Sequence, residues 1–391
     1  MFQDRFHWGF GIEDTFIGDP HPVTGKVLDE YELTDHYRLW KEDFDRIGTI
    51  GLDSVRWGIP WYRVQPEKNK WDWSFTDQVI PYIVQEKKLH LVLDLMHYGV
   101  PTWMKQAYLD PDYPQYVEAY TARVIERYHD KSFGAMHRVA LAPCSPFSVS
   151  ADLLRESAVL ARQYGVRLHT HLCETKDEEA FMLAREGVRP LEYMENLGWT
   201  GDDVWFAHGI HFNDEELRVL AKTRTGVAHC PISNMKLSSG IARIPEMLSL
   251  GVPVGLAVDG SASNDGSSLM EELRISYLLH RLNSSKAAPS GYELLKMATR
   301  GSAAILGRSD DIGSLAVGKC CDLFLIDSRR LELVGACFDP KSVLATVGVR
   351  GAVDYTVVQG RVTVEQGHLV TVDEESLARE AEEKCRAYLN R

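Results

Sequence analysis

The sequence has no long apolar run and no basic cluster, and each absence removes a class of protein. No stretch approaches the roughly 18 consecutive apolar residues that a membrane helix needs. The formal net charge is -13, and no run of Lys and Arg stands against this acidic balance. Phosphate backbones are bound by clustered cations. We therefore expect no nucleic-acid partner and no membrane span.

Paired cysteines are also lacking. The seven cysteines include no Cys-X-X-Cys pair, and only Cys320 and Cys321 are adjacent. Such an odd, scattered set does not indicate a disulfide framework and favours a reducing compartment. The N-terminal segment carries Asp4, Arg5 and Asp14 where a secretory signal would need an unbroken apolar stretch. We expect a cytoplasmic protein.

What the chain does have is a regular alternation of short apolar runs with amphipathic stretches. With 391 residues, 45% of them hydrophobic, it is long enough for one barrel and a small accessory domain. Eight parallel strands alternating with helices predict a closed (β/α)8 TIM barrel, in the α/β class. The eight runs are Phe6–Ile12, Leu52–Ile59, Leu89–Met96, Arg138–Pro143, Val166–Cys173, Val204–Ile210, Gly226–Pro231 and Val252–Asp259.

The pattern changes after the barrel. From Asp311 onward, regularly spaced glycines separate short apolar runs such as 323–326 and 355–358, which predicts a small antiparallel accessory sheet. The last stretch, 374–391, sets apolar residues on one face among charges and predicts a closing surface helix.

Metal-binding and acid–base side chains follow four of the predicted strands. The segments are His169–Glu174 (His-Thr-His-Leu-Cys-Glu), His208–His211, His229–Pro231 and Asp259–Ser261. In a parallel barrel the carboxyl ends of the strands meet at one face, so these side chains should lie together. Imidazole and carboxylate groups are ligands of zinc. A lone His at a strand end is more often a hydrogen-bonded core residue, and for His97, His211 and His229 we favour that interpretation.

Residues 1 to about 128 resemble the first three units of family 1 glycoside hydrolases. The segments that carry the resemblance are Phe6–Gly9, Arg56–Val64 and Asp94–Pro101. It implies that Arg56 and His97 line a sugar or substrate site. The family's Asn-Glu-Pro and Glu-Asn-Gly segments, which hold its two catalytic carboxylates, do not occur here. Because a retaining glycosidase needs both, a carbohydrate-binding barrel is the most that this part supports.

Residues from about 126 to 391 resemble the amidohydrolase superfamily, most closely its purine and triazine deaminases of the 8-oxoguanine deaminase type. Beside the four segments above, the resemblance rests on Ala142–Pro146, Phe206–Gly209, Val258–Asp265 and Gly313–Lys319. It implies a hydrolase of C–N bonds in cyclic amidines, a small heterocyclic substrate and a divalent metal, most simply zinc.

The same resemblance implies roles for individual residues. His171 and Asp259 would be metal ligands, with His208 as a further candidate. Asp259 would also take a proton from the attacking water, and Glu174 would carry protons to the ring nitrogen and the departing ammonia. His208 would face the water or the substrate, and Asn264 would lie at the substrate.

The family's His-X-His pair on the first strand is missing, and Trp8–Asp14 stands in its place. A catalytic zinc usually has three protein ligands, so the metal site is incomplete unless His208, Glu13, Asp14 or His97 contributes. We therefore expect an impaired enzyme, or a chain that binds no metal.

Taken together, the two resemblances predict a barrel assembled from two parents. Residues 1–128 would supply strands one to three, 129–308 strands four to eight, and 309–391 the accessory region with the terminal helix. Seven of the nine tryptophans fall within the first 103 residues, which fits a change of parent. Three hypotheses stay open: an impaired metal-dependent aminohydrolase, an engineered chimera without activity, and a glycosidase-like carbohydrate-binding barrel. A homo-oligomer is compatible with each.

Overall fold

The structure of the chain is a computed structural model. It describes residues 9–12, 16–17, 27–49, 54–87, 89–94, 100–101, 103–104, 112–349, 351–370, 373–376, 378–379, 382 and 386. Glu13, Asp14 and His97 lie outside the described residues, as does most of the stretch predicted to be the closing helix. No described helix is both long enough and apolar enough to cross a bilayer.

Eight parallel strands form the central sheet, and each falls within one of the eight predicted runs or differs from it by a residue. They pair in the order β1-β4-β5-β6-β7-β8-β9-β10. Their bounds are β1 Gly9–Ile12, β4 Ser54–Gly58, β5 His90–Asp94, β6 His137–Leu141, β7 Arg167–Leu172, β8 Val204–His208, β9 Gly226–His229 and β10 Val254–Leu256. The prediction of eight parallel strands alternating with helices is confirmed.

A closed barrel would need a further ladder between β10 and β1. Among the described residues the ladders run from β1 to β10 without that pair. Leu256 in β10 instead lies within hydrogen-bond distance of a helix: its backbone N is 3.3 Å and its O is 3.2 Å from Ser302 Oγ. In the part of the chain described, the sheet is therefore a curled parallel sheet whose last strand contacts a helix.

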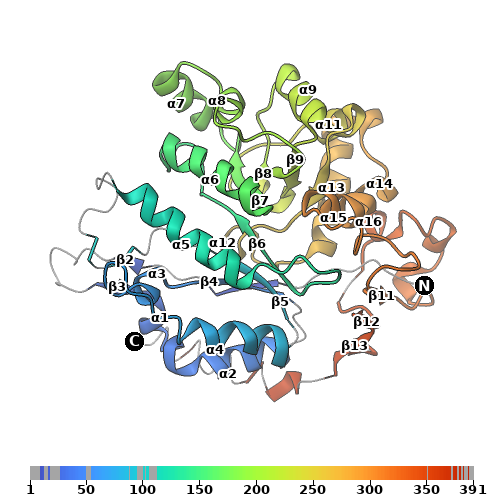
Figure 1. Ribbon diagram of the computed structural model, residues 1–391. Coiled ribbons are helices and arrows are strands. Elements are labelled where there is room, and N and C mark those ends of the chain that lie inside the picture. Colours follow the sequence, from blue (N-terminus) through green and yellow to red (C-terminus); the bar gives the residue numbers. More distant parts are fainter. Residues whose placement is uncertain are drawn as a thin grey trace.

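Helices follow the strands along the chain (Figure 1). Those before β6 are α1 Glu30–Leu33, α2 His36–Thr49, α3 Trp61–Val64, α4 Thr76–Pro81, continued by the π-helical turn η1 Tyr82–Glu86, and α5 Tyr113–Tyr128. Those up to β10 are α6 Ala151–Tyr164, α7 Lys176–Glu186, α8 Pro190–Asn196, α9 Asp214–Thr223, α10 Pro231–Lys236 and α11 Ile244–Leu250. After β10 come α12 Ser261–Asn264, α13 Leu269–Ser284, η3 Ser285–Ala287, α14 Gly291–Lys296, η4 Met297–Gly301 and α15 Ser302–Ile305.

Local chemistry explains where these helices start and end. Asn213 caps α9 by accepting from the Glu216 backbone N–H, and the Glu216 side chain accepts from the Asn213 backbone N–H; Asn followed three residues later by Glu is the sequence pattern of this capping box. Ser150 caps α6 in the same sense, and the helix ends at Gly165 with φ of 64°. Because glycine takes this left-handed conformation without steric cost, the chain can turn directly into β7.

The small accessory sheet is antiparallel, as predicted. Its order is β11-β12-β13-β14, with bounds Leu323–Leu325, Tyr355–Val358, Arg361–Glu365 and His368–Leu369. The short helices η5 Leu331–Leu333, η6 Ala336–Phe338 and α16 Val343–Thr346 lie between its first two strands in sequence. In Figure 1 this sheet lies at the periphery, away from α7 and α8. A separate two-stranded ladder joins β2 Phe16–Ile17 to β3 Leu28–Asp29.

The core on the N-terminal side is strongly aromatic. Trp57 in β4 is fully buried, stacks with Tyr31 and meets Phe44 edge-on. Its indole N–H donates to His36 Nε2 at 3.2 Å, so the polar end of the ring is satisfied. Trp61 is also fully buried and stacks on Tyr120 of α5. Several of the N-terminal tryptophans are therefore core residues.

Candidate metal centre

The candidate site lies where β7, β8 and β10 end. Alternation along β7 buries Leu168, Thr170 and Leu172 on one face and turns His169 and His171 to the other. His208 is the last residue of β8, opposite Leu172 in the ladder. Asp259 follows β10 by three residues. The sheet thus brings three residues far apart in the sequence to one edge.

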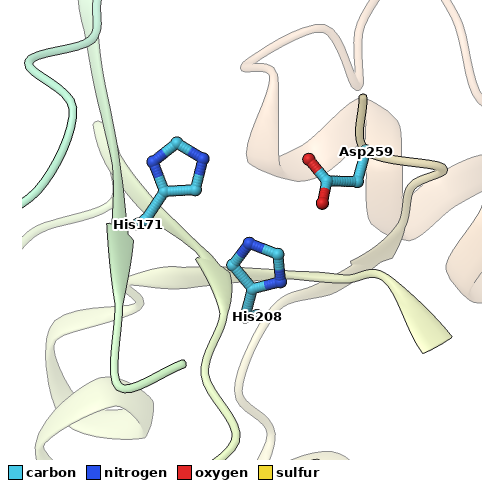
Figure 2. A group of neighbouring side chains, drawn as sticks. All are labelled: His171, His208 and Asp259. Carbon is cyan, nitrogen blue, oxygen red and sulfur yellow. The ribbon is translucent and has the colours of Figure 1, made fainter. Parts of the chain in front are cut away.

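His171, His208 and Asp259 form a cluster in which one ligand atom of each lies within 4.8 Å of the others. Figure 2 shows the two imidazole rings and the carboxylate converging on a common space. In the described part of the chain, it is the one group of three or more His, Cys, Asp or Glu side chains with this spacing. Two imidazoles and a carboxylate are a ligand set that suits zinc.

Backbone conformation supports a functional origin for this edge. His208 has φ of 68°, Asp259 has φ of 67° and Cys173, next to Glu174, has φ of 54°. The left-handed region costs a residue with a Cβ on the order of 1–2 kcal/mol. Three such residues at the ends of the same strands indicate that surrounding contacts impose the geometry, which is typical of a site.

His171 and Asp259 are each held by hydrogen bonds to neighbouring groups of the protein. His171 Nδ1 donates to the backbone oxygen of Cys144 at 2.6 Å, which leaves Nε2 as the atom able to bind a metal. The Asp259 carboxylate accepts through Oδ2 from Ser233 Oγ at 2.6 Å and from Ser263 Oγ at 3.0 Å. A metal-binding histidine with its second nitrogen on a backbone carbonyl is the usual arrangement.

Burial and charge act in opposite directions on the pKa values. For His171, burial disfavours the charged ring, but the contacts with Cys144 and the charge of Asp259 outweigh it and raise the pKa to about 9. Burial likewise opposes ionisation of Asp259, yet the hydroxyl of Ser233 and the proximity of His208 lower its pKa overall. Asp259 is therefore ionised at neutral pH, as a ligand or base must be.

Glu174 lies beside the cluster. Its Oε2 is 3.6 Å from His208 Nε2, and its Oε1 accepts from Ser239 Oγ at 3.2 Å. The turn that carries it is fixed by buried Glu178, whose carboxylate accepts from the backbone N–H groups of Cys173 and Glu174, both at 3.0 Å. Burial raises the pKa of Glu178 to about 7.

The other predicted site residues take different places. Arg56 is an exposed residue of β4, and its charge contributes to lowering the pKa of His169, mainly a result of burial, to about 3. Asn264 is buried and donates to Glu272 Oε1 at 2.5 Å, while its own oxygen accepts from the Ser267 backbone at 2.5 Å. Both polar ends of Asn264 therefore bond to the protein.

Two histidines that we expected to be structural do make internal contacts. His211 Nε2 lies 3.0 Å from the backbone oxygen of Ser239. His229 is fully buried, and its Nε2 lies 3.2 Å from Nε2 of His280. The third, His97, is outside the described residues.

The sequence-based search missed two residues of α10. Ser233 binds Asp259, and Asn234 Oδ1 lies 2.8 Å from His208 Nδ1. The sequence signal for this helix is Pro231, which directly follows His229 and Cys230. Proline is common at the first position of a helix, so it predicts that a helix begins at this strand end and carries the next polar residues.

Comparison with known proteins gives the family. The Amidohydrolase family model matches residues 82–363. The match begins well before Glu126, where the resemblance to amidohydrolases in the sequence begins. It includes β5, the third strand of the central sheet, which the resemblance to glycoside hydrolases also covers. No glycoside hydrolase segment is supported by the comparisons.

Curated relatives resemble part of the chain. The 8-oxoguanine deaminase of Pseudomonas aeruginosa is 47% identical over 251 residues, which are 64% of this chain and 55% of that protein. Hydroxydechloroatrazine ethylaminohydrolase of Pseudomonas sp. strain ADP is 46% identical over 263 residues, 66% of this chain and 54% of that protein. The chain thus spans about half the length of the curated relatives it matches.

Solved structures extend the likeness to the fold of nearly the whole chain. Atrazine chlorohydrolase from Arthrobacter aurescens TC1, solved in complex with zinc, superposes with a TM-score of 0.72 at 27% identity, covering 90% of this chain and 80% of that one. An amidohydrolase from a Sargasso Sea environmental sample gives a TM-score of 0.69 at 25% identity and covers 100% of this chain and 85% of that one. By the extent of the family match, the chain belongs to the amidohydrolase family.

Proposed function

We propose that the protein is a metal-dependent aminohydrolase that removes an amino group, as ammonia, from a purine or triazine ring. The observation that carries the proposal is the convergence of His171, His208 and Asp259 beside Glu174. The names of the relatives, which include an 8-oxoguanine deaminase, a 5'-deoxyadenosine deaminase and a hydroxydechloroatrazine ethylaminohydrolase, support this substrate class.

His171, His208 and Asp259 would hold the metal, most simply zinc. Their donor set fits the ion: each imidazole has its Nδ1 hydrogen-bonded to the protein and can release the proton from Nε2 to bind a metal, and the carboxylate is ionised. Such an ion would supply Lewis acidity, which lowers the pKa of water to about 7 and so would make a nucleophile available at neutral pH.

The carboxylates move the protons. Asp259, kept ionised by Ser233 and His208, accepts a proton from the attacking water as the new C–O bond forms at the ring carbon. Glu174 lies beside His208, at the same edge of the sheet as the cluster, and it delivers protons to the ring nitrogen of the substrate and to the leaving amine. Both of these protons come from the attacking water: Asp259 hands on the one that it accepted, Glu174 passes one to the ring nitrogen and one to the amine, and both carboxylates end ionised as the C–N bond breaks and ammonia departs.

Arg56, His97 and Asn264 are the proposed substrate-binding residues. Arg56 fits this role best, since its exposed guanidinium contributes to the field at His169, two residues before His171. The bonds of Asn264 to Glu272 and Ser267 favour a role in holding the loop after β10.

We further propose that the metal is held weakly, so that activity is impaired. The chain has no His-X-His pair on β1, and the family resemblance assigns two ligands to that pair. Three protein ligands are enough for a catalytic zinc, but with His208 recruited as a ligand it is no longer free to face the substrate. Glu13 and His97 are the proposed additional ligands.

The two-parent origin, with a closed barrel and boundaries near 128 and 308, also stays a proposal. It is supported by the tryptophan-rich first 103 residues and by curated relatives that match 251 to 263 residues, about two thirds of the chain. An inactive engineered chimera and a carbohydrate-binding barrel are then the two alternative functions.

Ammonia release from guanine, 8-oxoguanine and amino-triazines, measured with zinc added and with zinc chelated, tests the proposal. We expect slow, zinc-dependent release that Asp259→Asn and Glu174→Gln each abolish. The matched control is Asp152→Asn, which neutralises an exposed carboxylate of α6 paired with Arg155. Release that persists in both site variants would assign the activity elsewhere. A zinc-loaded protein that acts on none of these substrates would favour the inactive chimera.

A further inference from the structure

Side chains of one short helix form hydrogen bonds with two of the three cluster residues. Helix α10 presents Ser233 and Asn234 at consecutive positions. Ser233 donates to Asp259, and Asn234 lies against His208. The start of the helix is tied to α13, because the Ile232 backbone N–H donates to Glu272 Oε2 at 3.1 Å. The helix is thus anchored behind the site and contacts it through two side chains.

The contact of Asn234 is buried. Asn234 is 1% exposed and His208 is 2% exposed, so water does not compete for their hydrogen bond. The distance from His208 Nδ1 to Asn234 Oδ1 is 2.8 Å. An amide oxygen only accepts, so Nδ1 carries the proton in this arrangement. Nε2 then keeps its lone pair, and it is the nitrogen that lies toward Glu174.

We propose that Asn234 is a positioning residue that fixes the Nδ1–H tautomer of His208 and thereby sets the metal affinity of the cluster. The inference rests on the proposed function for its biological meaning. It goes beyond that function by assigning the choice of tautomer to one side chain that touches neither substrate nor metal.

Among the described neighbours, Glu174 acts in the opposite sense, because its carboxylate, 3.6 Å from His208 Nε2, favours a proton on that nitrogen. The strained backbone of His208, with φ of 68°, sets the direction of the ring. It does not determine which of the two ring nitrogens carries the proton. Asn234 Nδ2 is buried without a partner among the described residues, so the amide is held by the oxygen that faces His208. The reversed amide would donate to Nδ1 and place the proton on Nε2, which would prevent Nε2 from binding a metal.

The tautomer can be measured directly on the whole, metal-free protein. Nitrogen NMR of 15N-histidine-labelled protein distinguishes protonated from unprotonated ring nitrogens, and the signals that vanish in His208→Gln identify His208. We record the spectrum at a pH high enough for the ring to be neutral, and expect its single proton on Nδ1 in the unchanged protein. A neutral ring with its proton on Nε2 would overturn the proposal, whatever any variant does.

Zinc affinity, measured by competition with a chelator, gives the second readout. Residues that orient a metal-binding histidine typically contribute 10- to 100-fold in affinity, so we expect Asn234→Leu, which keeps the volume and removes the acceptor, to weaken zinc binding by about that factor. Asn234→Asp keeps an acceptor oxygen and should restore both the tautomer and most of the affinity.

The matched control is Asn213→Ala. It removes another side-chain oxygen that accepts a hydrogen bond, in the capping box of α9, without contact with the cluster. We expect a loss of stability with unchanged zinc affinity and an unchanged His208 tautomer. Equal zinc affinity in Asn234→Leu and the unchanged protein would contradict the proposal. Because neither readout uses turnover, an inactive protein would refute the proposed function and leave this inference standing.

Discussion

The part of the chain before β6 and the part from β6 onward use their side chains differently. Before β6 the described core is built from stacked and edge-on aromatic rings around Trp57 and Trp61. From β6 onward lie all three cluster residues together with their hydrogen-bond partners, among them Ser233 and Asn234. In Figure 1 the blue elements α2, α4, β4 and β5 lie below, and the green elements α6, α7, α8 and α9 lie above.

The difference indicates that the aromatic core and the candidate metal site lie in different parts of the chain. The sheet is continuous across the boundary, where Leu91, Val92 and Leu93 of β5 pair with His137, Arg138 and Val139 of β6. The earlier part can therefore complete the sheet without adding a described residue to the cluster. Stability and metal binding should respond to different substitutions.

The largest expected effect is on metal binding. Asp259→Asn removes the one charged ligand of the cluster, so zinc affinity should fall by more than the roughly 100-fold that marks the upper range for merely orienting residues. The counterpart before β6 is Asp77→Asn, which neutralises a carboxylate paired with Arg127. Chelator competition should show no change for that variant; a similar loss in both would mean that metal binding depends on both parts.

Trp57→Ala should affect stability and leave the metal site intact. Removing a fully buried ring from a packed core costs about 3–5 kcal/mol. Urea denaturation measures that loss, and zinc titration of the remaining folded protein should return the affinity of the unchanged chain. If zinc binding weakened by tenfold or more, the aromatic core would be supporting the cluster directly.

Two arginines, one in each part, allow a finer comparison. Arg189 donates to both oxygens of buried Glu216, each at 2.9 Å, and to the backbone oxygen of His211. Truncating it leaves Glu216 buried without its cation, so Arg189→Ala should cost on the order of 3 kcal/mol. Arg127, half-exposed in its pair with Asp77, should cost at most about 1 kcal/mol in Arg127→Ala. Urea denaturation of the two variants checks the order, and equal losses would contradict it.

The last and most gradual expected effect is a change in the free energy of unfolding with pH. Burial raises the pKa of Glu272 from 4.5 to about 8, so between these values the folded state binds more protons than the unfolded state. Stability therefore falls as pH rises through this window, by at most about 1.4 kcal/mol per pH unit. His229 and His280 act in the opposite direction below about 6.5, since burial lowers their pKa values, whereas His171, with its pKa raised to about 9, adds to the fall.

Between pH 7 and 8 both Glu272 and His171, whose pKa is raised to about 9, make stability fall as pH rises, so the Glu272 contribution is the difference in slope between the unchanged protein and Glu272→Gln. The unchanged protein should lose stability across this interval. Glu272→Gln should show a flatter dependence, whatever its absolute stability. An equal slope in both would show that Glu272 is already ionised in the folded state.

Sequence patterns were sufficient for the elements of the fold. Apolar runs located all eight parallel strands, and the Asn213–Glu216 pair marked the start of α9, because burial and capping are local properties. Whether the sheet closes into a barrel could not be predicted from these local patterns. It depends on what lies beside β10, and Ser302, which contacts Leu256 there, is 46 residues away in sequence.

The site shows the same limit. His171 and Asp259 came from motifs, and the cluster brings His208 to them as the third member. Pro231 marks the helix start that carries Ser233 and Asn234, but not their contacts with the cluster, since serine and asparagine near a helix start are most simply caps. Only the fold reveals that these two side chains point back to residues on neighbouring strands.

The central claim is that the ends of β7, β8 and β10 together form one metal site. A crystal structure of the zinc-treated protein, with anomalous data collected on both sides of the zinc absorption edge, tests it directly. We predict one strong anomalous peak bounded by His171 Nε2, His208 Nε2 and the Asp259 carboxylate. A zinc-loaded protein with its peak elsewhere, or no peak at these three side chains, would contradict the account.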